Sequence, residues 1–240
     1  MLPINWIRAI GLLMLISATL VLTDDLAKYL HADSPLVSGL VFGGLIYILA
    51  MNGGMVVRMC LKGELKNSKI GIGAERMINQ WVPAKNVRVS VIEHEKMRTS
   101  LVGERGGYRL FITTGALRDM SPAGMIGVLA HEAGHVRLKH TDQLCVLFGA
   151  LGGSKIAFGI PPLGVIVLLF SYLYLSRRRE YAADAEGARQ VGKDAMFAAF
   201  SELREATQET DISRFSEFFV SHPSLHRRIE HIQHLNFANQ

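Results

Sequence analysis

Two histidines and a glutamate in one short stretch could bind a metal ion and act on water. His131 and His135 are four residues apart and enclose Glu132 in the sequence His-Glu-Ala-Gly-His. In a helix, residues four apart share one face, so both imidazoles can reach one ion while Glu132 lies beside it. Zinc suits this pattern because it accepts imidazole nitrogens and keeps an open position for water. The alternative for so short a pattern is a surface histidine pair beside a helix glutamate.

A second pair of residues could complete the metal site. Glu180 and Asp184, in Arg-Glu-Tyr-Ala-Ala-Asp, are again four apart. A catalytic zinc with two histidines typically takes one carboxylate as its third protein ligand. We therefore expect Glu180 to ligate and Asp184 to accept a hydrogen bond from a ligating histidine, which fixes its tautomer. We place both at the start of a helix, where acidic residues are also common for purely structural reasons.

Local patterns predict the elements that must position these side chains. Ser121 and Pro122 indicate the first turn of the helix that carries His131, with serine as the N-cap and proline just inside. Other predicted elements are a helix over 71–80 and strands over 87–91 and 108–114.

The remaining sequence indicates a membrane protein. Of 240 residues, 49% are hydrophobic and 20% charged, and the mean hydropathy of +0.22 is high for a soluble domain and low for a pure membrane bundle. The apolar runs 2–23 and 34–57 are each long enough for one bilayer crossing of about 20 residues. A cleaved signal peptide is the alternative for the first run. The third run, 144–176, contains a Pro-Pro pair and predicts a hairpin that crosses twice or re-enters.

These runs divide the chain into four parts. Residues 1–57 form a predicted pair of transmembrane helices, and 144–176 the apolar hairpin. We expect residues 58–143 and 177–240 to form the two parts of one globular domain, which carries the metal-site residues. Basic residues follow the second run, so the positive-inside rule places this domain in the cytoplasm. His131, His135 and Glu180 can share an ion only if the hairpin returns to the side on which it began.

Charge and cysteine content exclude other classes. The net charge is +5, yet the chain has no basic cluster with interleaved aromatic residues, so we expect no nucleic-acid partner. The basic residues beside the apolar runs instead favour contact with anionic lipid. Two cysteines cannot form a disulfide framework. The sequence does not indicate an oligomeric state.

Three motifs in this order resemble the M48 family of membrane metallopeptidases. They are His131–His135, Arg179–Asp184 and a stretch from Ser221 to Ile229 that contains His222-Pro223 and Arg228. The resemblance covers nearly the whole chain. It implies an α+β, mainly helical integral membrane protein with a gluzincin-like zinc metalloprotease domain that carries a small β-sheet.

The resemblance also implies roles for individual residues. His131, His135 and Glu180 would hold one Zn²⁺ per chain, Glu132 would be the general base, and Asp184 would support a ligand. His222 would hold substrate or stabilise the oxyanion, and Arg228 would brace the site. The implied activity is endopeptidase cleavage of membrane or misfolded proteins during quality control and stress, at the bacterial inner membrane with the active site facing the cytoplasm.

The substrate is expected to add alongside an exposed strand, for which we select Tyr108, Leu110, Ile112 and Thr114. One departure from the family lies close by. Members commonly have Asn-Ala shortly before the edge strand, whereas this chain reads Thr99-Ser100-Leu101-Val102-Gly103. At this segment the resemblance therefore implies no contact to the substrate or to the helix that carries His131.

Two other functions compete with this interpretation. An intramembrane protease of the site-2 type also uses His-Glu-x-x-His, but the charged residues Arg137, Lys139 and Asp142 follow the motif too closely for bilayer depth. The second alternative is a membrane-anchored zinc domain that acts as a non-proteolytic sensor or signal transducer. His140, which we place past the useful face of the zinc helix, has no assigned role.

Overall fold

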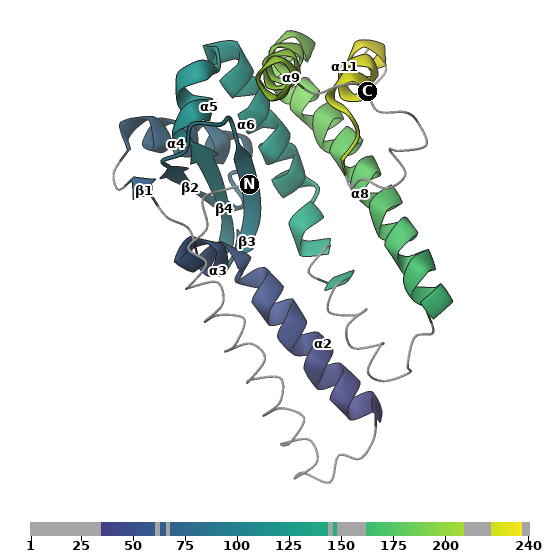
Figure 1. Cartoon of the computed structure of the whole chain (residues 1–240). Helices are drawn as coiled ribbons and strands as arrows, with labels where there is room; N and C mark the ends of the chain where they lie inside the picture. The colour runs from purple at the N-terminus through teal and green to yellow at the C-terminus, as the bar shows by residue number, and fades with distance from the viewer. Residues whose placement is uncertain are drawn as a thin grey trace.

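The computed structural model describes residues 35–60, 63–65, 68–143, 146–147, 162–208 and 222–236. It is mainly helical with one small mixed sheet, as predicted (Figure 1). The helices are α2 (Pro35–Met51), α3 (Gly53–Cys60), α4 (Lys69–Trp81), α5 (Thr114–Asp119), α6 (Pro122–Arg137), α8 (Pro162–Val191), α9 (Lys193–Thr207) and α11 (Leu225–His234). The strands are β1 (Glu64–Leu65), β2 (Asn86–Ile92), β3 (Thr99–Glu104) and β4 (Gly107–Thr113).

The sheet has the strand order β1-β2-β4-β3. Strand β4 pairs in parallel with β2 and antiparallel with β3, so both of its edges are occupied, and β3 ends the sheet. The prediction that 108–114 is an exposed strand for substrate is therefore wrong. Tyr108, Leu110 and Ile112 are at most 2% exposed and lie in the core. Thr114 begins α5, and its hydroxyl is bonded to the backbone N–H and C=O of His94.

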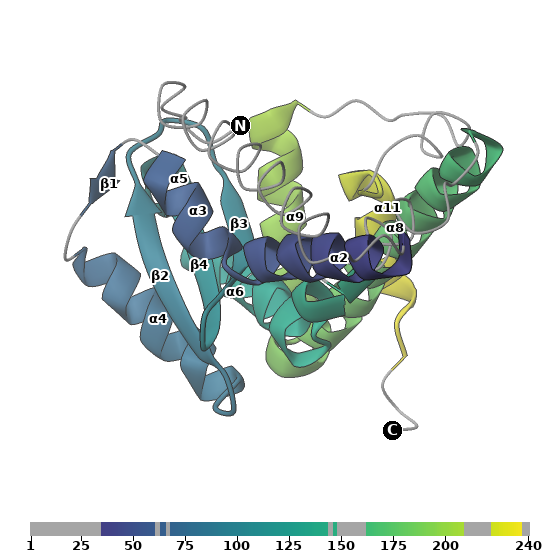
Figure 2. The same ribbon diagram turned by 90° about the horizontal axis from the view of Figure 1, so that it is seen from below.

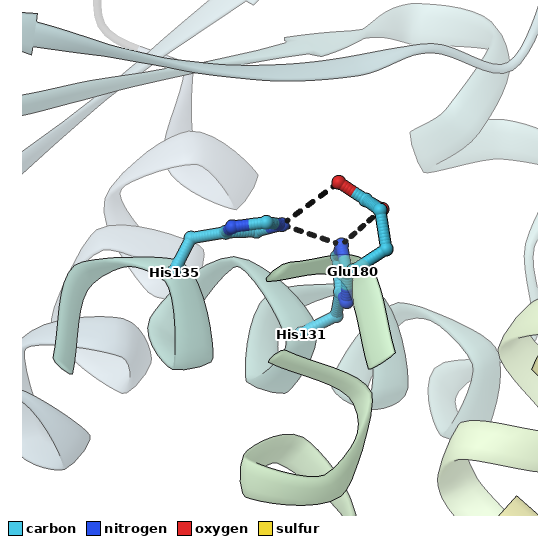
Figure 3. Close-up of side chains that lie close together, drawn as sticks. All are labelled: His131, His135 and Glu180. Carbon is cyan, nitrogen blue, oxygen red and sulfur yellow. Dashed lines mark hydrogen bonds and ion pairs between the residues drawn. The ribbon is translucent and has the colours of Figure 1, made fainter. Parts of the chain in front are cut away.

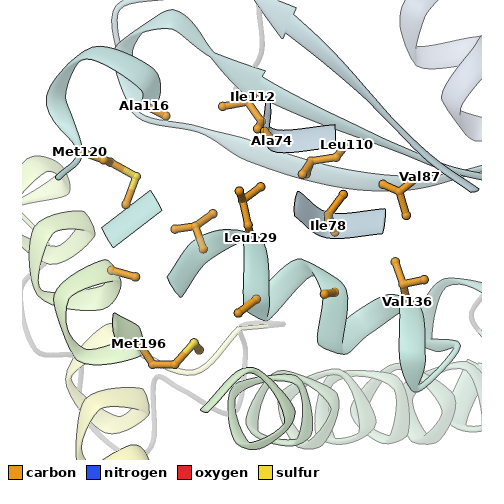
Figure 4. Close-up of a cluster of buried hydrophobic side chains, with 14 of the residues drawn as sticks. Ala74, Ile78, Val87, Leu110, Ile112, Ala116, Met120, Leu129, Val136 and Met196 are labelled. Atoms are coloured by element: carbon orange, nitrogen blue, oxygen red, sulfur yellow. The ribbon is translucent and has the colours of Figure 1, made fainter. Parts of the chain in front are cut away.

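One face of the sheet forms the main core. Figure 4 shows Val87, Leu110 and Ile112 from the strands facing Ile78 on α4 and Leu129 on α6. Helices α8 and α9 cover the other side of α6, which is thus held between the sheet and these two helices. This arrangement gives the helix with the His-Glu-Ala-Gly-His motif fixed neighbours on both sides.

The opposite face of the sheet is covered by α3, which lies across the strands in Figure 2. At Gly54 an added Cβ would lie only 3.1 Å from the Cβ of Glu104, so glycine permits this close approach. The predicted single helix over 34–57 is instead two helices, α2 and α3, with a bend of 57° between them. In the described part of the chain, this bent pair is the only candidate for a membrane span by length and composition.

Helix α8 is longer than expected. Its 30 residues run from Pro162 through Glu180 to Val191 and join the end of the third apolar run to the acidic motif. The prediction that a helix starts near Glu180 is wrong, because neither proline nor glycine lies between Val165 and Glu180 to interrupt the helix. The run 2–23 and the turn over 159–161 lie outside the described residues.

Candidate metal centre

Helix α6 presents its two histidines as a pair. The Nε2 atoms of His131 and His135 are 3.1 Å apart, and both rings lie at the contact with α8. The predicted N-cap is confirmed: the Ser121 hydroxyl accepts a hydrogen bond from the Gly124 N–H. Glu202 on α9 accepts hydrogen bonds from the Ser121 N–H and hydroxyl, which fixes the start of α6 against its neighbour.

Glu180 on α8 completes a set of three donors, shown in Figure 3. Its carboxylate oxygens lie 3.6 Å from Nε2 of His131 and 3.4 Å from Nε2 of His135. Ligands about 2.1 Å from a tetrahedral zinc ion stand about 3.4 Å from one another. The separations of 3.1–3.6 Å are close to that value, with a different oxygen of Glu180 facing each histidine, so the three residues can hold one metal ion.

A glycine allows α6 and α8 to meet at this point. A Cβ added to Gly134 would lie 2.6 Å from the carbonyl oxygen of Ala183. Gly134 adjoins His135, and Ala183 lies on α8 between Glu180 and Asp184. The near contact of the two backbones thus sets the distance from the histidines to the glutamate.

Two buried residues, Asp184 and Arg228, contact the donor set. Asp184 is fully buried, and its Oδ1 lies 2.8 Å from Nδ1 of His131, which leaves Nε2 directed at the metal position. Arg228 on α11 donates to both oxygens of Asp184 at 2.9 and 2.6 Å, and its Nη1 is 3.2 Å from Glu180. Helix α11 is thereby linked to the site.

The charges of these groups favour anionic carboxylates. Burial alone would raise the pKa of Asp184, but the charge of Arg228 and the contact with His131 outweigh it and lower the pKa. Burial likewise opposes ionisation of Glu180. Hydrogen bonds with His135 and His222, and the charges of His131 and Arg228, hold its pKa well below the ordinary value. Glu180 is therefore in the state that a metal ligand requires.

Glu132 lies between the two histidines in sequence and is 7% exposed. Its Oε1 accepts a hydrogen bond of 3.1 Å from the Thr99 hydroxyl, at the start of β3. The departure from the family pattern at this strand thus coincides with a direct contact to Glu132 on α6.

Comparison with known proteins agrees with this geometry. The sequence model of peptidase family M48 matches residues 72–236. The chain belongs to family M48. It is 29% identical to Protease HtpX from Psychrobacter sp. over 164 residues, and equally to Protease HtpX from Escherichia coli O1:K1 over 167 residues. These alignments cover 50% of the chain and 54% and 56% of the relatives, so the chain spans about half of their length.

A solved structure shows the same fold as this M48 chain. The crystal structure of S. mikatae Ste24p matches with a TM-score of 0.73 over 95% of the chain and 64% of Ste24p. The sequence identity is 16%. The match therefore extends the fold likeness beyond the half of the chain that aligns with Protease HtpX.

His222 lies beside the three candidate metal donors. Its Nδ1 lies 3.3 Å from Oε1 of Glu180, and its side chain is 67% exposed. The contact with Glu180 raises the pKa of His222. The structure thus brings together the histidines, acids and arginine selected from the sequence, whereas Tyr108, Leu110 and Ile112 lie in the core instead.

His140 contacts the candidate metal donors, although no sequence pattern predicts this contact. Its Nδ1 lies 2.8 Å from Nδ1 of His135, and the residue is buried. Burial and the nearby His135 lower the pKa of His140 to about 4, so the ring is neutral and can accept a hydrogen bond from His135. Helix α6 ends at Arg137, and Lys139 has a positive φ of 55°, so the chain turns back. If the helix continued past Arg137, His140 would lie on another face, so the helical pattern does not predict this contact.

Proposed function

We propose that the chain is a zinc-dependent endopeptidase that hydrolyses peptide bonds in membrane or misfolded proteins during quality control. The observation that carries this proposal is the donor set of His131, His135 and Glu180, spaced for one zinc ion with Glu132 alongside. A structural zinc site normally has four protein ligands. Three donors and a neighbouring carboxylate are the arrangement of a catalytic site instead.

The residues of the site have different roles in hydrolysis. Zinc, when bound, supplies Lewis-acid chemistry that polarises the peptide carbonyl and makes water more acidic. Glu132 takes a proton from the attacking water and then passes it to the leaving amine, because one positioned carboxylate can serve as base and acid in turn. Asp184 keeps His131 in the ligating tautomer. His222, exposed beside Glu180, is suited to hold the substrate or to stabilise the oxyanion.

The terminal strand β3 is the better place for the substrate backbone. It ends the described sheet, so its outer backbone groups can pair with an extended peptide. Its first residue, Thr99, contacts Glu132, so a peptide along β3 passes the general base. Main-chain pairing requires little sequence preference, which suits a protease for misfolded chains.

Exposed apolar side chains support anchoring in a membrane. Figure 1 shows α2 and the first half of α8 projecting from the same side of the molecule. Leu40 and Ile48 on α2, and Val167 and Leu169 on α8, are each more than half exposed. With the positive-inside pattern of the sequence, these helices favour the inner membrane with the metal centre on the cytoplasmic side.

A cleavage assay tests the proposal. Full-length protein in detergent, with its zinc content measured, should cleave quenched fluorescent casein, and carbonate-washed membranes should retain the activity. Glu132→Gln should keep the zinc and abolish cleavage. Glu230→Gln, at an exposed position on α11, is the matched control and should cleave normally. Zinc binding without cleavage by the unmodified protein would refute the protease and favour a sensor domain.

A further inference from the structure

The first side chain of strand β3, Thr99, contacts helix α6. Side chains alternate along a strand, so Thr99 and Leu101 share one face and Ser100 and Val102 the other. Leu101 packs against the main core and Val102 against the cluster under α3. The face of Thr99 is therefore the face covered by α6, in agreement with its hydrogen bond to Glu132.

The backbone around Thr99 is held firmly. Thr99 pairs with Ile112 of β4. The preceding residue, Arg98, donates its N–H to the Thr113 hydroxyl at 2.9 Å and accepts the Thr113 N–H at 3.1 Å. Thr113 is fully buried and also donates to the carbonyl of Lys96 at 2.8 Å. The Thr99 hydroxyl is thus a donor on a fixed support, which is the condition for holding another side chain in one orientation.

A donor of this kind can hold the carboxylate of Glu132 in one orientation. A glutamate side chain has several rotatable bonds, whereas proton transfer requires its carboxylate within hydrogen-bond reach of the water. Among the residues that the structure describes, the Thr99 hydroxyl is the hydrogen-bond donor placed on this carboxylate, and it binds Oε1. This contact leaves Oε2 for the reacting water.

We infer that Thr99 is a positioning residue for Glu132, which couples the strand edge that receives the peptide to the carboxylate that moves the proton. The inference rests on the proposed function. It assigns a role to the position at which this chain departs from the Asn-Ala of its family. Because the hydroxyl acts on Glu132 and not on the metal ligands, its loss should lower turnover and leave zinc affinity unchanged.

Substitutions that separate the hydroxyl from the side-chain shape test this role. Thr99→Val keeps the shape and should lower kcat about 10- to 100-fold, the range for partners that orient a site residue, with little change in KM. Thr99→Ser keeps the hydroxyl and should retain most of kcat. Thr207→Val, the same change at an exposed position at the end of α9, is the matched control. Zinc affinity, measured by chelator competition, should equal that of the unmodified protein in all three, and Thr99→Ala replaces the valine variant if that variant does not fold.

The outcomes are distinct from those that test the protease itself. Absence of cleavage by the unmodified protein overturns both proposals. Cleavage that Glu132→Gln abolishes but Thr99→Val leaves unchanged overturns the role of Thr99 alone. The same conclusion follows if Thr99→Ser is as slow as Thr99→Val, if only KM rises, or if Thr99→Val loses zinc. Slow turnover in Thr99→Val, with normal zinc binding and a normal Thr99→Ser, supports the inference.

Discussion

Gly134 determines how closely the two ligand-bearing helices approach, so Gly134→Ala should disable the metal centre without unfolding the protein. The added Cβ would lie 2.6 Å from the carbonyl oxygen of Ala183, whereas ordinary contact begins at 3.4 Å. Helices α6 and α8 must therefore separate locally by about 0.8 Å. Metal–ligand distances vary by only about 0.2 Å, so Glu180 could no longer ligate together with both histidines.

Gly134→Ala should affect zinc affinity and turnover much more than stability. A misplacement of this size costs about 100-fold in activity, and zinc affinity should fall by at least about 10-fold. The free energy of unfolding should change little. Overpacking destabilises the fold by about 1–3 kcal/mol, whereas replacing glycine by alanine within a helix stabilises the helix by about 1 kcal/mol. Circular dichroism should remain that of the unmodified protein.

Gly73→Ala on α4 is the matched control. An added Cβ there has nothing within 4 Å, so the same chemical change should stabilise the helix by about 1 kcal/mol and leave zinc binding intact. Zinc affinity by chelator competition and casein cleavage in detergent measure both variants. If Gly134→Ala bound zinc and cleaved casein like the unmodified protein, close backbone approach could not be what sets the ligand distances.

Two further substitutions test the residues behind the ligands. His140→Leu removes the acceptor for His135 and should weaken zinc binding about 10- to 100-fold, whereas His140→Gln should restore much of it; equal affinity in all forms would exclude an orienting role. Asp184→Ala leaves the buried Arg228 unpaired and should lower the free energy of unfolding in denaturant by about 3–5 kcal/mol, so an unchanged midpoint would contradict the importance of this pair.

Each half of the candidate metal centre was predictable because it depends on residues that are close together in the sequence. His131 and His135 lie four apart on one helix, as do Glu180 and Asp184, and the helical repeat alone places each pair on one face. The Ser121 cap is equally local. His140 was missed because its position depends on a turn at Lys139, a residue type that gives no signal for positive φ.

The edge of the sheet was not predictable in the same way, since strand order depends on pairing between distant segments. The sequence nevertheless contained a clue. Strand β4 includes the unbroken run Leu110-Phe111-Ile112, and such runs are typical of strands buried on both faces. Leu110 and Ile112 face the main core, while Phe111 packs under α3. A strand with two covered faces belongs in the middle of a sheet.

Helix α8 relates the metal centre to the proposed membrane segment, because one continuous helix carries both. Leu175 is the last strongly exposed apolar residue on α8, and Glu180 follows five residues later. At 1.5 Å per residue this is a rise of about 7.5 Å. If the apolar half of α8 lies in the bilayer, Glu180 is held within about one and a half helical turns of its boundary. On the proposed function, a peptide on β3 would then be cut where a chain leaves the membrane, and we expect membrane-proximal segments to be the more accessible substrates.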